Sequence, residues 1–394
     1  MLAICLQRPH EASQAPEQQP VRVVVTGQVG LDKKDFLQRA VAAAEQMGRR
    51  YRLFNVGDRM YAEAPDVPPG RILELPPSRL NALRRSVFKD LLAEASAGDD
   101  IVVNTHATFR WRHGLFYAFD YDQMKALNAD LYVTLVDNVD RVHARLVRDG
   151  HTEHTLKDLM VWREEEILAT ELLANLVRGH GRFCVLARGN GDSSARTLAR
   201  LIAASHLKTA YLSYPMSHVA HHGQLLAEIE HFRGQVKRHF VCFDPADLDE
   251  KYLAREALGA AEQGRRFLTR NIDGAEVTFE TAEVLGILGD IDGQIYARDF
   301  KLIDQSELTI AFIPQLPAGP DGHARPAISS GVERELQHAH EAAKEVFVIW
   351  RPQAEPSPFI TQTANRVFRS TDEAVRFFLT NNYVPPPPSG RLFE

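Results

Sequence analysis

A glutamate one helical turn after a glycine is the residue in this sequence best suited to nucleophilic chemistry. The segment Ser329–Ala339 predicts a helix start, with Ser330 at the N-cap and Glu333 completing a capping box. Glu335 lies one turn beyond Gly331, and helical side chains lean toward the N-terminus, so we expect its carboxylate to pass over a residue without a side chain. The helix dipole favours the ionised form there. An ionised carboxylate facing room for a sugar suits attack on an anomeric carbon.

A second group of candidate residues follows the first apolar run. Val21–Thr26 predicts a buried strand, and Gly27–Lys34 follows it before a helix. A P-loop needs glycines for close backbone approach to phosphate, a lysine for the β- and γ-phosphates, and a hydroxyl for magnesium. Gly27, Gly30 and Lys33 have the expected types and spacing.

Two positions of this loop depart from the P-loop pattern. Asp32 stands where a glycine normally precedes the lysine, and a carboxylate in an anion-binding loop opposes phosphate. Lys34 stands in the hydroxyl position, which removes a magnesium ligand. The loop therefore indicates nucleotide binding without efficient catalysis, and it leaves the need for magnesium open.

Residues 21–190 resemble an archaeal-type adenylate kinase. The resemblance rests on Asn55–Met60, Asn104–Thr108 and Arg141–Asp149. In that family the residue at the position of Asn104 is usually acidic, and an arginine-rich lid segment stands where this chain has His151–Thr155. The resemblance implies a degenerate P-loop domain with these candidate nucleotide-binding residues: Gly27, Gly30, Lys33, Lys34, Arg145 and Arg148.

Because several catalytic parts are missing, we interpret this domain as a pseudo-kinase that senses a nucleotide, with ATP or another nucleotide as its ligand. A scaffold with a relic loop and a working nucleoside monophosphate kinase are the alternatives.

Residues 207–380 resemble the nucleoside 2-deoxyribosyltransferase family, and within it the 2′-deoxynucleoside 5′-phosphate N-hydrolases. The tyrosine of the first strand matches Tyr211, and the aspartate that opens the helix before the central strand matches Asp299. The glutamate of Gly-Val-x-x-Glu-Leu matches Glu335. The Arg-Pro-Gln strand end matches Arg351–Gln353, and a following serine matches Ser357.

The resemblance implies double displacement without a cofactor or metal. Glu335 would attack C1′, Asp299 would serve the leaving base and then water, and Tyr211 would hold Glu335 in place. A serine such as Ser357 reaches into the neighbouring subunit's site in the relatives, so a homodimer or higher homo-oligomer is implied. The candidate substrate-binding residues are Ser217, Ser329, Ser330, Gly331 and Ser357.

Two departures put the substrate in doubt. Tyr214–Ser217 replaces the small residues that follow the first strand in the relatives, and Leu316–Ile328 is an insertion rich in Pro and Gly. Structural roles are the alternative for the catalytic pair, with Asp299 as a helix cap and Glu335 as a solvated helix residue.

Composition excludes several classes of protein. The 394-residue chain has a net charge of −6, so no overall positive field would attract nucleic acid or an anionic membrane. No apolar run is long enough to cross a bilayer, and we expect a cytoplasmic protein. Cys5, Cys184 and Cys242 lie far apart and predict isolated thiols of a reducing compartment.

Strand-like and helical segments alternate along the chain, which predicts two doubly wound parallel-sheet α/β domains. We expect a P-loop kinase-like domain over 21–190 and a flavodoxin-like or Rossmann-like deoxyribosyltransferase-type domain over 208–381. A linker helix over 191–207 would join them. A flexible arm over 1–20 and a Pro-rich tail over 382–394 would flank them.

Together these features predict a nucleotide N-glycosidase, a hydrolase rather than a transferase, that is regulated by a nucleotide on the kinase-like domain. A deoxyribosyltransferase, a non-catalytic nucleotide sensor or assembly protein, and a nucleoside monophosphate kinase are the alternatives.

Overall fold

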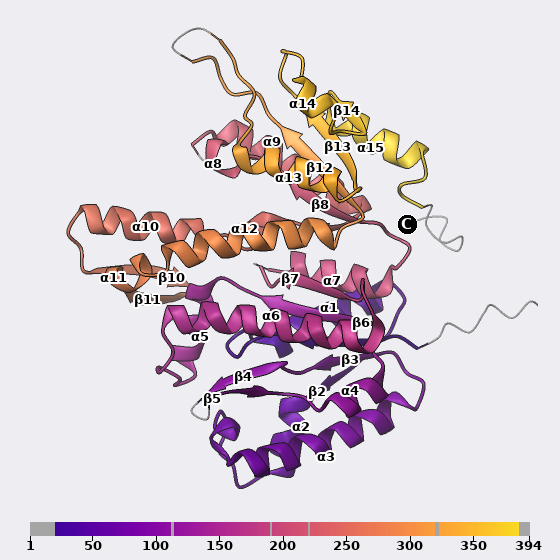
Figure 1. Cartoon of the computed structure of the whole chain (residues 1–394), viewed down its shortest axis with the longest axis vertical. Helices are drawn as coiled ribbons and strands as arrows, with labels where there is room; N and C mark the ends of the chain where they lie inside the picture. Colours follow the sequence, from indigo (N-terminus) through magenta and orange to yellow (C-terminus); the bar gives the residue numbers. More distant parts are fainter. Residues whose placement is uncertain (1–19, 112–113, 190, 220, 320–322, 386–394) are drawn as a thin grey trace, which may run out of the picture.

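The computed structural model describes residues 20–385, apart from 112, 113, 190, 220 and 320–322 and the side chains of residues 217 and 218. The expected N-terminal arm and most of the expected Pro-rich tail lie outside the described residues. Two five-stranded sheets, each covered by helices, stand one above the other (Figure 1). Every strand pair within these two sheets is parallel, which confirms the predicted α/β class.

The first sheet has the strand order β2-β3-β1-β6-β7. Its strands are β1 (Arg22–Thr26), β2 (Arg52–Asn55), β3 (Ile101–Asn104), β6 (Leu131–Val136) and β7 (Phe183–Ala187). Its helices are α1 (Lys33–Gln46), α2 (Val56–Glu63), α3 (Pro77–Ala95), α4 (Tyr121–Leu127), α5 (Val139–Arg148) and α6 (Leu156–Arg178). The central strand β1 is buried on both faces because Val23, Val24 and Val25 are fully buried, as a parallel strand between helical layers requires.

The second sheet has the strand order β14-β13-β12-β8-β9. Counted along the chain this is 5-4-3-1-2, the flavodoxin-like order, in which ligands bind where the order reverses. Its strands are β8 (Thr209–Ser213), β9 (Val241–Phe243), β12 (Leu308–Ile313), β13 (Glu345–Trp350) and β14 (Arg366–Phe368). Its helices are α8 (Met216–Val219), α9 (Gly223–His239), α10 (Lys251–Glu262), α11 (Thr281–Leu285), α12 (Leu288–Asp304), α13 (Ser330–Glu341), α14 (Pro358–Thr361) and α15 (Thr371–Thr380).

The segment between β8 and β9 holds two helices, α8 and α9, and α9 runs on to His239, so β9 begins at Val241. Helix α12 begins at Leu288, well before Asp299. The segment predicted as a linker forms α7 (Ser193–Ala203), which packs on the first domain through buried residues such as Leu198 and through the Tyr51 hydroxyl, a donor to Ile202 O at 2.6 Å.

Two hairpins outside the sheets were not predicted. They are β4–β5 (Thr108–Trp111 and Gly114–Tyr117) and β10–β11 (Phe267–Ile272 and Ala275–Glu280). The second turns at Asp273-Gly274, both with positive φ, and an Asp-Gly pair between two strand-like segments is a strong hairpin indicator.

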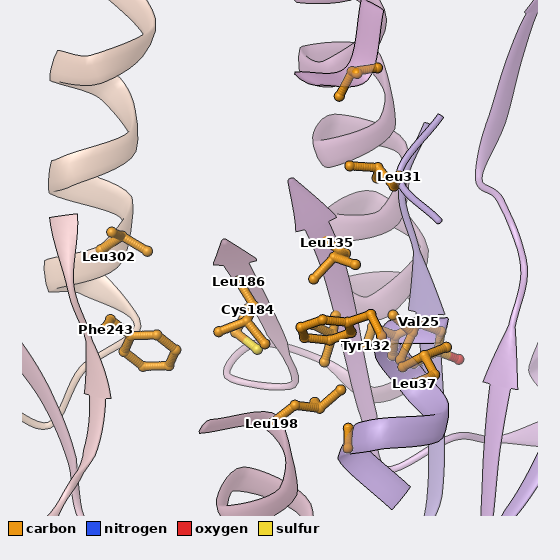
Figure 2. Close-up of a cluster of buried hydrophobic side chains, with 14 of the residues drawn as sticks. Val25, Leu31, Leu37, Tyr132, Leu135, Cys184, Leu186, Leu198, Phe243 and Leu302 are labelled. Atoms are coloured by element: carbon orange, nitrogen blue, oxygen red, sulfur yellow. The ribbon is translucent and has the colours of Figure 1, made fainter. Parts of the chain in front are cut away.

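The two domains share an apolar core. Phe243 of β9 and Leu302 of α12 face Cys184 and Leu186 of β7, the edge strand of the first sheet (Figure 2). Since this edge is covered by the second domain, the two sheets are joined by side chains that neither domain buries alone. No helix in the described ranges is both long and apolar enough to cross a membrane.

A buried ion pair lies at the same boundary. The Arg163 guanidinium of α6 donates to both carboxylate oxygens of Glu250, at 2.8 and 2.9 Å, and to Gln294 of α12. Glu250 also accepts the backbone N–H of Val139 at 2.7 Å. The side chains of Arg163 and Glu250 are only 6% and 0% exposed, so each charge relies on the other.

We expect Arg163→Ala to lower the free energy of unfolding by about 3–5 kcal/mol, because it leaves the Glu250 carboxylate buried without its counter-ion. Urea unfolding followed by circular dichroism measures this loss. Lys157→Ala is the matched control, since Lys157 of the same helix pairs with Asp290 of α12 at the surface and should contribute at most about 1 kcal/mol. Equal losses in the two variants would contradict the role of the buried pair.

Candidate functional site

The loop from Gly27 to Lys33 joins β1 to α1 at the carboxyl edge of the first sheet. Gly27 has φ +136°, and a Cβ there would lie 2.6 Å from the Leu135 carbonyl oxygen, so only glycine fits. Gly30 has φ +87° and lies against Val142 and Leu146. Asp32 has φ 47°, a left-handed conformation that a glycine adopts freely and aspartate tolerates at some cost. The backbone thus keeps the shape of a glycine-rich loop although one glycine is replaced.

A buried carboxylate holds the start of this loop. Glu166 of α6 is 1% exposed, and its two oxygens accept the backbone N–H groups of Gly27, Ala107 and Thr108, each at 2.8 Å. The Thr108 hydroxyl also donates to it at 2.7 Å. Glu166 therefore ties the loop after β1 to the segment after β3, and sequence reasoning missed it because nothing local marks a mid-helix glutamate.

Lys33 lies at the floor of the loop. Its ammonium donates to Gly27 O at 2.6 Å and lies 3.2 Å from a ring nitrogen of His106. Burial lowers the pKa of Lys33 to about 7, and the charge of Glu166 only partly opposes this. Burial, and then the Lys33 charge, hold the pKa of His106 well below its ordinary value. A phosphate would meet a lysine whose charge it can itself stabilise.

A cavity of about 330 Å³ adjoins the loop. Besides loop residues it is lined by four side chains that the sequence analysis did not single out as ligand-binding, Arg84, His106, Trp111 and His151. Arg84 is 7% exposed and donates to Tyr117 O at 2.6 Å. His151, from the segment that replaces the arginine-rich lid, packs edge-on against Trp111. The cavity has the size of a small-molecule site and combines apolar walls with a few cations.

Both arginines expected to contact phosphate, Arg145 and Arg148, form ion pairs with carboxylates. Arg145 is 2% exposed and contacts Asp137 at 2.7 Å, Asp273 at 3.3 Å and Asp32 at 3.8 Å. Arg148 pairs with Asp32 at 3.1 Å. A phosphate role for these arginines stays a prediction, and a phosphate would have to compete with Asp32, the residue that replaces the loop glycine.

Lys34 points to another partner. Its ammonium pairs with Asp58 at 2.7 Å, with both side chains more than half exposed. Asn104, which stands at the family's acidic position, donates to Asn55 at 2.9 Å. Neither residue offers the hydroxyl or carboxylate that would hold magnesium in a P-loop kinase.

The second candidate site lies where β8 meets α13. Tyr211 and Ser213 are two residues apart on β8, so both point to the same face, and both are fully buried. The Ser213 hydroxyl donates to the Glu335 carboxylate at 2.5 Å. The Tyr211 hydroxyl is buried without a hydrogen-bond partner of good geometry among the described residues, yet burial and then the Glu335 charge hold its pKa well above the ordinary value. The structure thus brings Tyr211 to Glu335, and it adds Ser213, which the sequence analysis missed.

Burial works against the expected ionisation of Glu335. It raises the pKa of Glu335 to about 7, with the Asp299 charge acting in the same direction and the hydrogen bond from Ser213 opposing it. Desolvation at this partly buried position outweighs the dipole, whose effect falls off within the first turn. Glu335 is therefore poised between its two protonation states near neutral pH.

Asp299 is not a helix cap. It lies in the last third of α12, is 8% exposed, and accepts two hydrogen bonds on one oxygen from Arg298, at 3.0 and 3.2 Å. Burial raises the pKa of Asp299, and the Arg298 charge opposes this. Because the Asp299 charge acts on both Glu335 and Tyr211, the three groups share one electrostatic environment.

The start of α13 differs from the prediction by one residue. Ser329, not Ser330, is the N-cap, and its hydroxyl accepts the Val332 N–H at 3.3 Å, so Glu333 completes no capping box. Gly331 leaves open space, since a Cβ there would meet only the Ser329 hydroxyl at 3.6 Å. Ser330 is exposed beside it.

Two further predicted serines are not placed at this site by any contact. The side chain of Ser217 lies outside the described residues. Ser357 is exposed at the N-cap of α14, where it makes no capping hydrogen bond. Its expected reach into a neighbouring subunit stays a prediction.

Comparisons with known proteins concern the first site. An AAA domain family model matches residues 26–163. The adenylate kinase of Pyrococcus furiosus is 28% identical over 136 residues, which are 33% of this chain and 66% of that kinase. The adenylate kinase of Thermococcus onnurineus is 26% identical over 137 residues, 33% of this chain and 66% of that kinase. The chain thus spans just under two thirds of the length of these kinases.

Solved structures are only distantly similar. A shikimate kinase from Bacteroides thetaiotaomicron has a TM-score of 0.32 at 15% identity, covering 47% of this chain and 97% of that one. A sugar kinase from Janibacter has a TM-score of 0.28 at 15% identity, covering 46% of this chain and 94% of that one. Likenesses this slight carry no argument about function.

Among the functions expected from the sequence, the comparisons favour the nucleotide kinase over the N-glycosidase, on which they are silent. The N-terminal half is a P-loop kinase-like domain with adenylate kinases among its homologues.

Proposed function

We propose that the N-terminal domain binds a nucleotide as nucleotide kinases do, with the phosphates at the loop from Gly27 to Lys33. The observation that carries this is the Lys33 ammonium, buried at the floor of a glycine-shaped loop beside a cavity of about 330 Å³. Its pKa of about 7 gives an anionic ligand a group that becomes fully charged on binding.

The surroundings of the cavity support the same ligand. Arg84 adds a second buried cation, and Trp111 and His151 add aromatic rings that a base can contact. The homology of this half to adenylate kinases agrees with a nucleotide rather than another anion.

Binding is proposed ahead of efficient phosphoryl transfer. Transfer depends on magnesium held near the loop, and here Lys34 and Asn104 stand where ligands of the metal or of its waters are expected. Asp32 adds a negative charge close to the phosphate position and engages Arg148. We therefore expect ADP formation from ATP and AMP to be slow, with binding intact.

We expect ADP binding, measured by isothermal titration calorimetry, to weaken about tenfold or more in Lys33→Met, because a charged hydrogen bond to phosphate is lost. Lys89→Met, at an exposed lysine of α3 outside the cavity lining, is the control and should bind as the parent does. Asp32→Gly should bind more tightly, since it removes a carboxylate from the loop and one of the two carboxylate partners of Arg148. In the parent, affinity should rise as the pH falls from about 8.5 to about 7, because Lys33 gains its proton over that range.

Absence of ADP binding at millimolar concentration, or equal affinity in Lys33→Met and the parent, would refute nucleotide binding at this loop. Rapid ADP formation from ATP and AMP that Lys33→Met abolishes would make the domain a working kinase and overturn the proposal of slow transfer.

A second function is inferred for the C-terminal domain, cleavage of the N-glycosidic bond of a (deoxy)nucleoside 5′-phosphate. The observation that favours it is the placing of Glu335 against Ser213 and Tyr211 with the raised-pKa carboxyl of Asp299 in the same field. Paired carboxyl groups with separated roles are the usual equipment for glycosidic bonds. The space over Gly331 leaves room for a sugar.

The reaction would run in two steps. Ionised Glu335 attacks C1′ while the C1′–N bond breaks, and the base leaves with the bonding electrons and takes the proton of Asp299. Water then attacks C1′ as Asp299 recovers a proton from it, and the Glu335 ester is released. Tyr211 and Ser213 would orient the Glu335 carboxylate. A homodimer in which Ser357 completes the partner's site belongs to the same proposal.

We expect the protein to release free base from a deoxynucleoside monophosphate, and Glu335→Gln to abolish this because amide nitrogen and oxygen cannot form the glycosyl ester. Asp299→Asn should lower the rate by about 10²-fold or more through loss of acid catalysis. Liquid chromatography of a panel of nucleotides detects the base. Glu333→Gln, an exposed neighbour on the same helix, should keep full activity. Base release that survives Glu335→Gln would sink the mechanism.

The raised pKa of Glu335 should also make the stability of the substrate-free protein depend on pH. Its pKa rises from an ordinary 4.5 to about 7 on folding, so between these values the folded chain holds more protons than the unfolded chain. Stability must therefore fall as the pH rises through this window. Glu335→Gln cannot ionise, so its Tm should exceed that of the parent at pH 8 by more than it does at pH 4.5, as scanning calorimetry would record. Glu333→Gln should show no such pH-dependent gain, and a flat difference for Glu335→Gln would contradict the raised pKa.

A further inference from the structure

A cavity of about 840 Å³ lies between the two domains and includes none of the residues of the two sites described above. It is bordered by α7 and the start of α5 from one side and by α9, α10 and β10 from the other. Its volume lies in the range of small-molecule and cofactor sites.

The lining of this interdomain cavity is basic in an acidic protein. Seven of its side chains are Arg or Lys and four are Asp or Glu, whereas the whole chain carries a net charge of −6. A concave surface with walls of low dielectric focuses the field of such a cluster. The cavity therefore attracts anions although the protein as a whole does not.

Some of these cations already form ion pairs with carboxylates of the protein. Arg233 and Lys237 pair with the buried carboxylate of Asp244, at 2.7 and 2.6 Å. Arg270 pairs with Asp140. These ion pairs hold the walls of the cavity and leave little charge for a ligand.

Three arginines of the lining have no carboxylate partner among the described residues. Arg200 donates to the carbonyl oxygens of Arg238 at 3.2 Å and of Phe240 at 3.3 Å, so it closes the end of α9 without meeting a carboxylate. Arg196, one turn before it on α7, and Arg238, at the end of α9, are exposed at the cavity and pair with no carboxylate in the described part of the chain. Arg238 donates one hydrogen bond, to the Gln235 side chain at 3.4 Å. A guanidinium without a carboxylate partner offers a planar set of donors that suits phosphate oxygens.

A polar and an aromatic residue complete the lining. Asn138, at the start of α5, borders the cavity, although its side-chain oxygen is itself buried. Tyr252, 55% exposed on α10, adds an aromatic ring to the same cavity.

We propose that this interdomain cavity is a further ligand site, and that it takes a phosphate-bearing small molecule of the size of a nucleoside diphosphate. Arg196 and Arg238 bind the phosphates, Arg200 adds its charge, and the ring of Tyr252 offers a surface for the rest of the ligand. The site stands on residues that neither proposed function uses, so it can be tested whether or not those functions hold.

The test is protection of arginine side chains in the full chain. The protein is treated with phenylglyoxal, with and without ADP, and modified peptides are quantified by mass spectrometry. ADP should protect Arg196 and Arg238 several-fold, while Arg50, which is exposed and does not line the cavity, should react equally in both samples. Protection of Arg84 alone would place ADP only at the 27–33 loop and overturn the proposal.

Affinity gives the second readout. Arg196→Ala combined with Arg238→Ala should weaken or remove one ADP-binding event in calorimetry, by about tenfold or more, with Tm unchanged because both side chains are exposed. Arg50→Ala should change nothing. Unaltered ADP binding in the double variant overturns the proposal. The proposal is also overturned if an RNA oligonucleotide displaces ADP and the RNA is itself released when the salt is raised from about 50 to about 200 mM. That result would identify the cavity as a groove for polyanions.

Discussion

The buried pairing of Arg163 with Glu250 is the contact on which the arrangement of the two halves rests. Three residues further along α6, Glu166 ties the glycine-shaped loop to the segment after β3. One turn of α6 therefore contacts both the domain boundary and the loop from Gly27 to Lys33. Through Gln294, which contacts Arg163, the same turn touches α12, the helix that carries Asp299. Neither candidate site can shift far without disturbing this helix.

The loop keeps the backbone shape of a glycine-rich loop although one glycine position is occupied by aspartate. Asp32 adopts the left-handed backbone of the glycine it replaces, so the chain path survives the substitution. Its carboxylate, however, meets Arg148 and lies within reach of Arg145, so it neutralises charge that a phosphate would otherwise use. The backbone of the loop thus keeps its path, while the Asp32 carboxylate adds a negative charge beside it.

Sequence reasoning worked where the evidence is local. The apolar run Val21–Thr26 predicted a buried strand, and β1 lies there with Val23–Val25 fully buried. It failed where a partner comes from afar, as with Glu166 on the loop. Ser213 was within reach, since a residue two positions after Tyr211 on a strand shares its face. The raised pKa of Glu335 was not predicted because burial cannot be read from helix position alone.

The tip of the β10–β11 hairpin gives the domain boundary a different meaning from the one its sequence suggests. Asp273 crosses from the second domain into the arginines beside the phosphate loop, where it pairs with Arg145 and contacts Arg141. A fragment ending near residue 207 would fold around one negative charge fewer and would present a more cationic loop than the intact chain does. What that fragment bound would describe the fragment, and the natural unit for ligand discovery is therefore the whole chain.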